Sequence, residues 1–202
     1  MDTTLLLHFI VVCLIIEATP GPNMGYLALL TVRHGRRAGV ITVAGIAAGL
    51  AVIGSAAALG MAAALAEMPA LYQALRWVCM AYLLWIAWQS WQDNDIVSPG
   101  TMAEVAHQAP YFRRGFVINV LNPKAAMFYV STLPAFIDPA SPALFQTLAL
   151  TAFSVAVATA AHLTIVWLAS RVTPALENTR RQRIFRKTMA LLLAGVAVWF
   201  VL

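Results

Sequence analysis

The sequence predicts an all-α membrane protein with six transmembrane helices, arranged as two inverted three-helix repeats in which the first and fourth helices are broken. Two observations lead to this fold class. Of the 202 residues, 61% are hydrophobic and only 10% are charged, a balance that soluble domains of this length do not have. Prolines also interrupt two hydrophobic segments, at Pro20-Gly21-Pro22-Asn23 and at Asn122-Pro123-Lys124. Lipid offers no replacement for the lost backbone hydrogen bonds, so breaks at corresponding places in two halves indicate a binding site of the transporter type.

Six segments are long and apolar enough to be spans, which need about 20 residues each. They cover residues 4–32, 38–66, 70–91, 115–137, 143–170 and 186–202. The first is too long for a secretory signal peptide and begins with Asp2 instead of a basic residue, so we expect it to be retained. The last has only 17 residues, at the lower limit for a span, which keeps five spans open as an alternative.

The connections between the segments leave no room for an additional domain. We therefore expect a single transmembrane transporter domain over residues 1–202, with a first repeat at 1–92, a cytoplasmic linker at 93–112 and a second repeat at 113–202. The linker contains Pro99 and Gly100, which favour loops.

Basic residues predict the orientation of the spans. Eleven of the 13 lysines and arginines fall on one side, in three loops: Arg33, Arg36 and Arg37; Arg113 and Arg114; Arg171, Arg180, Arg181, Arg183, Arg186 and Lys187. The positive-inside rule places this side in the cytoplasm, so both termini should be periplasmic. Three spans per half then insert the second half upside down, as an inverted repeat requires. Contact of these loops with anionic membrane lipid accounts for the net charge of +5 without a nucleic-acid partner.

Three ionisable residues lie within predicted spans: Glu17, Lys124 and His162. Such groups are energetically expensive in a membrane and point to function by default. Each also has a purely structural interpretation. Glu17 could lie near the interface, Lys124 could extend to the cytoplasmic face, and His162 could bond a carbonyl of a neighbouring helix.

The first break has the chemistry of a zwitterion site. Pro20 and Pro22 remove two amide donors, and Gly21 lets the chain turn, so the carbonyls of residues 16–18 should be free to accept from a cation. The new helix that starts near Asn23 offers free amides and a positive dipole end to a carboxylate.

The second break repeats this chemistry. Pro123 interrupts the helix again, Asn119 and Asn122 add amide groups, and Lys124 adds a positive charge. A cation acceptor paired with an anion donor at mid-membrane suits an amino acid. The alternative is a pair of proline kinks without a ligand.

The chain resembles the LysE/RhtB family of bacterial amino-acid exporters, of the homoserine/threonine efflux type. Four motifs carry the resemblance, in order along nearly the whole chain: Pro20-Gly21-Pro22-Asn23-Met24, Gly35-Arg36-Arg37-Ala38-Gly39, Ala81-Tyr82-Leu83-Leu84-Trp85 and Asn119-Val120-Leu121-Asn122-Pro123-Lys124-Ala125. The resemblance implies a multi-pass protein of the bacterial inner membrane that exports amino acids and is coupled to protons. It also implies that the substrate-binding residues are Pro20, Gly21, Pro22, Asn23, Asn119, Asn122, Pro123 and Lys124.

The chain departs from the family in its fifth span. Many relatives carry an acid there, whereas residues 152–168 contain only His162 as a titratable group. Glu17 is therefore the first candidate for the proton carrier and His162 the second. Because Glu17 is the one acid within a span and Lys124 opposes it, we expect a neutral substrate such as threonine, homoserine or a small aliphatic amino acid. Apolar walls are expected from Met24, Met127, Phe128 and Tyr129.

Other functions remain open. Cys13 and Cys79, the only cysteines, could form the redox pair of a membrane thiol–disulfide electron carrier, although buried cysteines are more often small hydrophobes. A passive channel is a further alternative. The chain lacks His-Glu-x-x-His and Gly-x-Ser-x-Gly motifs, so we expect no enzymatic activity, no cofactor and no metal. The Gly-x-x-x-Gly motif at Gly45 and Gly49 serves either a homodimer or packing within the monomer.

Overall fold

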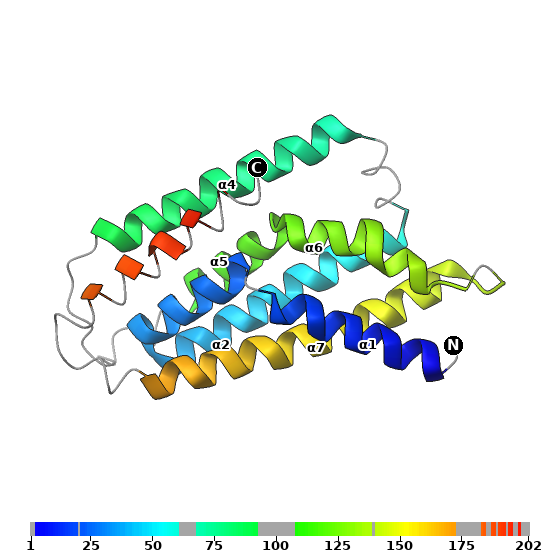
Figure 1. Cartoon of the computed structure of the whole chain (residues 1–202), viewed down its shortest axis with the longest axis horizontal. Coiled ribbons are helices and arrows are strands. Elements are labelled where there is room, and N and C mark those ends of the chain that lie inside the picture. Colours follow the sequence, from blue (N-terminus) through cyan, green and yellow to red (C-terminus); the bar gives the residue numbers. More distant parts are fainter. Residues whose placement is uncertain are drawn as a thin grey trace.

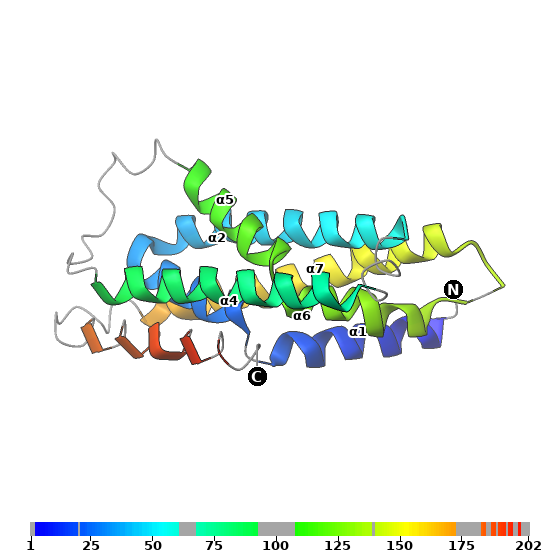
Figure 2. The same cartoon turned by 90° about the horizontal axis from the view of Figure 1, so that it is seen from above.

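Every regular element that the structure describes is a helix, which confirms the predicted all-α class. The computed structural model describes residues 3–19, 21–60, 68–92, 108–138 and 140–172, together with residues 183–184, 187–188, 190–192, 194–195 and 198. Most of the long helices run along the long axis of the molecule (Figure 1), and the view from above shows the same alignment (Figure 2).

Among the described residues, two helices are long and apolar enough to cross a membrane. They are α2 (Pro22–Ala58) and α7 (Ala143–Val172), whose apolar stretches cover Asn23–Ala58 and Ala143–Arg171. Helix α1 (Thr3–Ala18) is apolar but shorter. The predicted sixth span, 186–202, lies partly outside the described residues, so the count of six spans and their inverted repeat stay predictions.

Gly35 divides α2 into two segments. Its φ of 82° and ψ of 171° are not helical, and the positive φ suits a residue without a Cβ. In Figure 1 the chain turns back at this point. Residues 22–34 therefore complete the first predicted span and residues 36–58 form the second, with the turn inside the predicted gap between 32 and 38.

The second span ends earlier than predicted. The helix stops at Ala58, whereas the sequence favoured a span up to residue 66. Gly60 has a φ of 87° and its amide donates to the Ala57 carbonyl at 3.0 Å. A left-handed glycine at this position closes a helix. Residues 61–67 lie outside the described part of the chain.

The third and fourth predicted spans correspond to helices with shifted ends. Helix α4 covers Pro69–Gln92 and matches the predicted 70–91 closely. Helix α5 (Ala109–Val120) begins six residues before the predicted 115, because Pro110 fits the first turn of a helix. Residues 109–112, which we had assigned to the linker, are therefore helical. Residues 93–107 lie outside the described residues.

After the second break the chain changes helical type twice. Helix α6 (Pro123–Met127) leads into a π-helical turn, η2 (Phe128–Thr132), and then into a 3₁₀ turn, η3 (Leu133–Phe136). A π-turn is rare and is frequently found at functional sites.

The second segment of α2 is the centre of the packing, and its glycines allow close contact with α5. A Cβ added to Gly45 would lie 2.1 Å from the Phe112 carbonyl oxygen, and one on Gly115 would lie 2.3 Å from the Thr42 oxygen. At Gly49 the added Cβ would lie 3.1 Å from the Asn119 Cβ. The Gly-x-x-x-Gly motif thus faces α5 within the monomer, and a homodimer is not needed to explain it.

The turn at Gly35, the start of α5 and the end of α7 lie at the same end of the molecule. The His34 ring centroid is 5.5 Å from that of Tyr111 in α5, and Val32 packs in one cluster with Ala169 of α7. The N-terminus lies toward the other end (Figure 1). We call the first of these the basic end, because the arginines near Gly35, at the start of α5 and at the end of α7 gather there.

Gly45→Ala should destabilise the protein by about 1–3 kcal/mol, the usual cost of overpacking, because backbone atoms of α5 must move to admit the methyl group. Thermal unfolding in detergent measures this cost. Gly195→Ala is the matched control, since no atom of the described residues lies within 4 Å of its added Cβ. Equal melting temperatures for the two variants would contradict the close contact between α2 and α5.

Candidate functional site

The two helix breaks meet inside the molecule. Helix α1 ends at Ala18 and α2 begins at Pro22, while α5 ends at Val120 and α6 begins at Pro123. Asn23 Nδ2 donates a hydrogen bond of 2.9 Å to Asn119 Oδ1, and both side chains are buried. This bond joins the first break to the residue just before the second.

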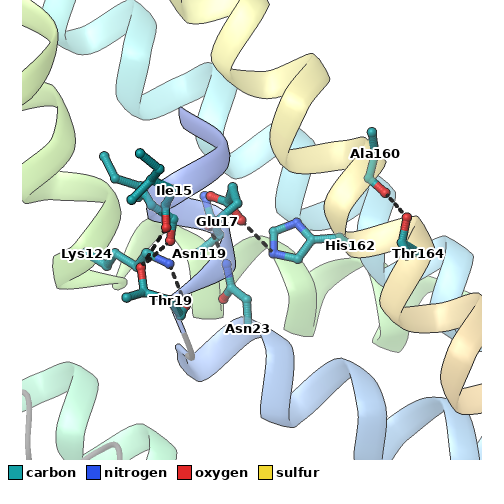
Figure 3. A network of polar contacts seen from close by, with 10 residues as sticks. Ile15, Glu17, Thr19, Asn23, Asn119, Lys124, Ala160, His162 and Thr164 are labelled. Atoms are coloured by element: carbon teal, nitrogen blue, oxygen red, sulfur yellow. Dashed lines mark hydrogen bonds and ion pairs between the residues drawn. The ribbon is translucent and has the colours of Figure 1, made fainter. Parts of the chain in front are cut away.

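Lys124 forms a further link between the breaks. Its Nζ donates to the Thr19 carbonyl at 3.0 Å, at the broken end of α1 (Figure 3). The Lys124 backbone amide donates to Asn122 Oδ1 at 3.0 Å, so Asn122 caps the helix that starts at Pro123. A Cβ on Gly21 would lie 3.6 Å from Lys124 Cδ, an ordinary contact. Lys124 therefore supplies the cation that a broken helix end needs.

The carbonyl that receives a cation at the first break belongs to Thr19, one residue beyond the predicted 16–18. Of the three predicted carbonyls, that of Ile16 is not free, because it accepts from both the amide and the hydroxyl of Thr19. Thr19 thus continues the hydrogen bonding of α1 one residue beyond Ala18, and its hydroxyl adds a second donor.

Glu17 of α1 and His162 of α7 point toward each other, as Figure 3 shows. His162 Nε2 lies 3.6 Å from Glu17 Oε2, and the two side chains are 3% and 19% exposed. This distance is too long for a hydrogen bond, but it is short enough for an ion pair when the imidazole is protonated. The sequence left open whether His162 serves function or only bonds a neighbouring helix, and the structure places it beside Glu17.

These side chains surround one small cavity of about 40 Å³. That volume holds a few water molecules but is far below the roughly 300 Å³ of a small-molecule pocket. The cavity must therefore widen to admit a solute the size of an amino acid. Its lining consists of Cys13, Ile16, Glu17, Gly21, Asn23, Met24, Leu50, Asn119, Asn122, Lys124, Ala125, Phe128, Ser154, Ala158 and His162.

Three buried polar atoms of the lining have no hydrogen-bond partner among the residues that the structure describes: Asn23 Oδ1, Asn119 Nδ2 and His162 Nδ1. Leaving such atoms unpaired is costly, so they are available to a ligand. Flipping both amides together would keep their mutual bond and still leave one acceptor and one donor free. The amide pair thus offers one acceptor and one donor under either assignment.

Most of the predicted site residues line this cavity, although they come from both halves of the chain. Pro123 is buried beside it, Pro22 begins α2, and Pro20 lies outside the described residues. Among the predicted walls, Met24 and Phe128 line the cavity, but Met127 is 50% exposed and lies elsewhere.

Sequence reasoning missed several lining residues. Leu50 and Ser154 were not singled out, and Cys13 was considered only for redox chemistry. Ser154 had a detectable signal, because it precedes His162 by two helical turns and so shares its face of α7. Leu50 had none, since its place depends on how α2 packs.

Cys13 is a free, buried thiol, whereas the side chain of Cys79 lies outside the described residues. Within the described part of the chain, no three His, Cys, Asp or Glu side chains come together as metal ligands would.

The fold and the site define an α-helical membrane protein with a small polar cavity between two broken helices. Residues 14–202 match the family model described as LysE type translocator, and the chain belongs to this family. The predicted family resemblance is therefore confirmed.

Several relatives have names that state a substrate. The chain is 24% identical to the homoserine/homoserine lactone efflux protein of Salmonella typhimurium, over 86% of this chain and 84% of the relative. It is 29% identical to the cysteine/O-acetylserine efflux protein of Salmonella paratyphi A, over 71% of each chain. It is 28% identical to the leucine efflux protein of Klebsiella pneumoniae, over 65% and 63%. No solved structure matches.

The bond between Asn23 and Asn119 should be measurable in a double-mutant cycle. We expect Asn23→Ala and Asn119→Ala to show a coupling of roughly 0.6–1.7 kcal/mol in thermal stability, the range for hydrogen bonds between membrane helices. Asn119→Ala combined with Thr164→Ala is the control cycle, because Thr164 bonds only its own helix in this structure, at the Ala160 carbonyl (Figure 3). Coupling equal to that of the control would show that the breaks do not meet in this way.

Proposed function

We propose that the protein is an inner-membrane exporter of a neutral amino acid such as threonine, homoserine or a small aliphatic amino acid. One observation carries the proposal. The cavity combines an unpaired acceptor and an unpaired donor, on Asn23 and Asn119, with the opposite charges of Glu17 and Lys124. The efflux of amino acids by the named relatives supports it.

The two charges of the cavity favour one orientation of the substrate. The carboxylate would lie close to the Lys124 ammonium group and accept from the free amide donor of the Asn23–Asn119 pair, while the substrate ammonium would lie close to Glu17 and donate to the free amide acceptor of that pair. Charge-assisted hydrogen bonds of this kind are about twice as strong as neutral ones. Each charge of a zwitterion would then have both a charged partner and an amide partner.

A neutral side chain fits the charge balance of the cavity. Glu17 is the one carboxylate among the lining residues, and Lys124 is the one ammonium group. A substrate with an additional positive charge would find no acid left to balance it. The rest of the wall is mostly apolar or small, with Ile16, Leu50, Phe128 and Ala158, which suits a short side chain.

Alternating access would expose the site to each side in turn. We propose six spans in two inverted repeats, each with one broken helix, that rock against one another around the cavity. The basic end would face the cytoplasm, and both termini would be periplasmic. A cavity too small for the substrate corresponds to a closed state between the two open ones.

Proton coupling would use Glu17, with His162 as its partner 3.6 Å away. The inward movement of one proton across 100 mV releases about 2.3 kcal/mol, which supports a concentration ratio of roughly fifty-fold. A carboxylate that releases its proton inside would then bind the substrate ammonium, so that proton and substrate alternate at Glu17.

The runner-up is a membrane thiol–disulfide electron carrier that uses Cys13 and Cys79. It draws support from the place of Cys13 in the cavity wall. It requires both thiols, whereas export requires neither.

Glu17→Gln should abolish the dependence of efflux on the pH gradient, because an amide cannot exchange a proton. Efflux of labelled amino acid from loaded vesicles, with and without a gradient, measures this dependence. Asp138→Asn is the control, since this exposed acid lies in the loop before α7, away from the cavity. The assignment of Glu17 is wrong if the glutamine variant keeps full gradient-dependent efflux.

Lys124→Met should weaken the apparent affinity for substrate by roughly ten- to a hundredfold, the effect of losing a hydrogen bond to a charged group. The substrate is first identified by screening the common amino acids for growth resistance in overexpressing cells. Lys187→Met removes the only other lysine, which lies over the Trp91 ring, and should leave the affinity unchanged. Similar affinities for the two variants would remove Lys124 from the site.

A further inference from the structure

We propose that Tyr129 is the exit gate of this cavity: its hydroxyl holds η2, α2 and α7 together at the cavity's far side from the basic end, and the substrate leaves when these bonds open. The direction of exit rests on the proposed function. The gate itself rests on the contacts of Tyr129.

Tyr129 is 2% exposed and lies directly behind two lining residues. Its hydroxyl donates to the Leu50 carbonyl of α2 at 3.3 Å and lies 3.2 Å from Ser154 Oγ of α7. Leu50 and Ser154 both line the cavity. One phenol oxygen thus connects three elements at the wall of the site.

This connection is weak enough to open. Ser154 Oγ also donates to the Thr151 carbonyl at 2.8 Å. The Tyr129 and Ser154 hydroxyls have one hydrogen each, and they share three oxygen contacts. One of the three contacts therefore always lacks a hydrogen. Tyr129 is held by two hydrogen bonds when Ser154 donates to it, and by the bond to Leu50 alone when Ser154 donates to Thr151, and such bonds are of modest strength.

The surroundings of Tyr129 form an apolar plug. The Phe9 ring centroid lies 5.9 Å from that of Phe128 and 5.2 Å from that of Phe136. Leu133 is buried in the same cluster. Beyond the cavity, water and a polar substrate would meet these rings first, so the plug has to move for exit.

A polar face of α7 continues past the plug. Ser154, Thr151 and Thr147 are all buried and follow one another at three- and four-residue spacing, which places them on the same face. Ser154 lies eight residues before His162, or about 12 Å further from the basic end. Polar groups inside a membrane protein often line a solute path, and these three follow α7 from Ser154 in the cavity wall toward the start of that helix.

The backbone at the gate departs from α-helical geometry. Tyr129 lies in the π-helical turn η2, a rare form that is frequent at functional sites. Across from it, Gly54 leaves room for the ring, because a Cβ there would lie 2.9 Å from Tyr129 Cε1 and 2.2 Å from Thr151 Cγ2. The ring is therefore closely fitted in the closed state and attached through a single polar atom.

Cys13 is a built-in reporter for the opening of this gate. It lines the cavity and is buried, and Cys79→Ala would leave it as the only thiol. In that background we measure the rate at which a membrane-impermeant sulfonated maleimide labels Cys13 from each side of the membrane. Tyr129→Phe should raise labelling from the outer face roughly three- to tenfold, the factors expected from losing one or two interhelical hydrogen bonds.

Ser154→Ala is a second variant, which still tests the gate if Tyr129→Phe fails to fold. It removes one of the two partners of Tyr129 and should raise outer labelling about threefold. Tyr26→Phe is the matched control, because Tyr26 is also buried but packs with Ala38 and Ile118 in a separate cluster. It should leave outer labelling unchanged.

The gate is refuted if neither Tyr129→Phe nor Ser154→Ala changes labelling, or if labelling rises only from the inner face. Labelling does not depend on transport, so the two proposals fail separately. Faster outer labelling without any amino-acid efflux would refute the proposed export and keep the gate. Normal efflux with unchanged labelling would refute the gate alone.

Discussion

The rule that every backbone polar group needs a partner away from water organises the molecule. The break after α1 leaves the Thr19 carbonyl without a helical partner, and Lys124, from the other half of the chain, donates a hydrogen bond to it. The second break is capped by Asn122, and the two are joined through Asn23 and Asn119. The side chains that hydrogen-bond to the broken helix ends are therefore the same side chains that give the cavity its charged and polar groups.

Close packing around the second segment of α2 keeps the repaired breaks in place. Glycines bring α5 against this segment along several turns, and Asn119 of α5 is thereby held over Gly49. Small residues let van der Waals contact replace the hydrophobic effect that lipid cannot supply. The same packing brings Leu50 to the cavity wall, so the second segment of α2 holds both the site and the gate in place.

The sequence predicted the helices and the breaks well, because prolines, glycines and arginines act locally. Pro123 and Gly35 interrupt helices wherever those helices pack. The pairing of Glu17 with His162 could not be predicted, since it depends on how far α1 slides along α7. The role of Tyr129 was hidden for the same reason, as a buried tyrosine resembles any other apolar wall until its partners are known. The early end at Gly60 was available from the sequence and was missed because the apolar run continues beyond it.

The turn at Gly35 has a mechanical consequence. Only one residue separates the two helical segments of α2, so there is no slack between them. Asn23 lies on the first segment and Leu50 on the second. Since no loop intervenes, a change in the angle between the two segments falls on the φ and ψ of Gly35, which glycine can vary freely. The position of Asn23 relative to Leu50 is therefore set by the conformation of this single residue together with the packing of each segment.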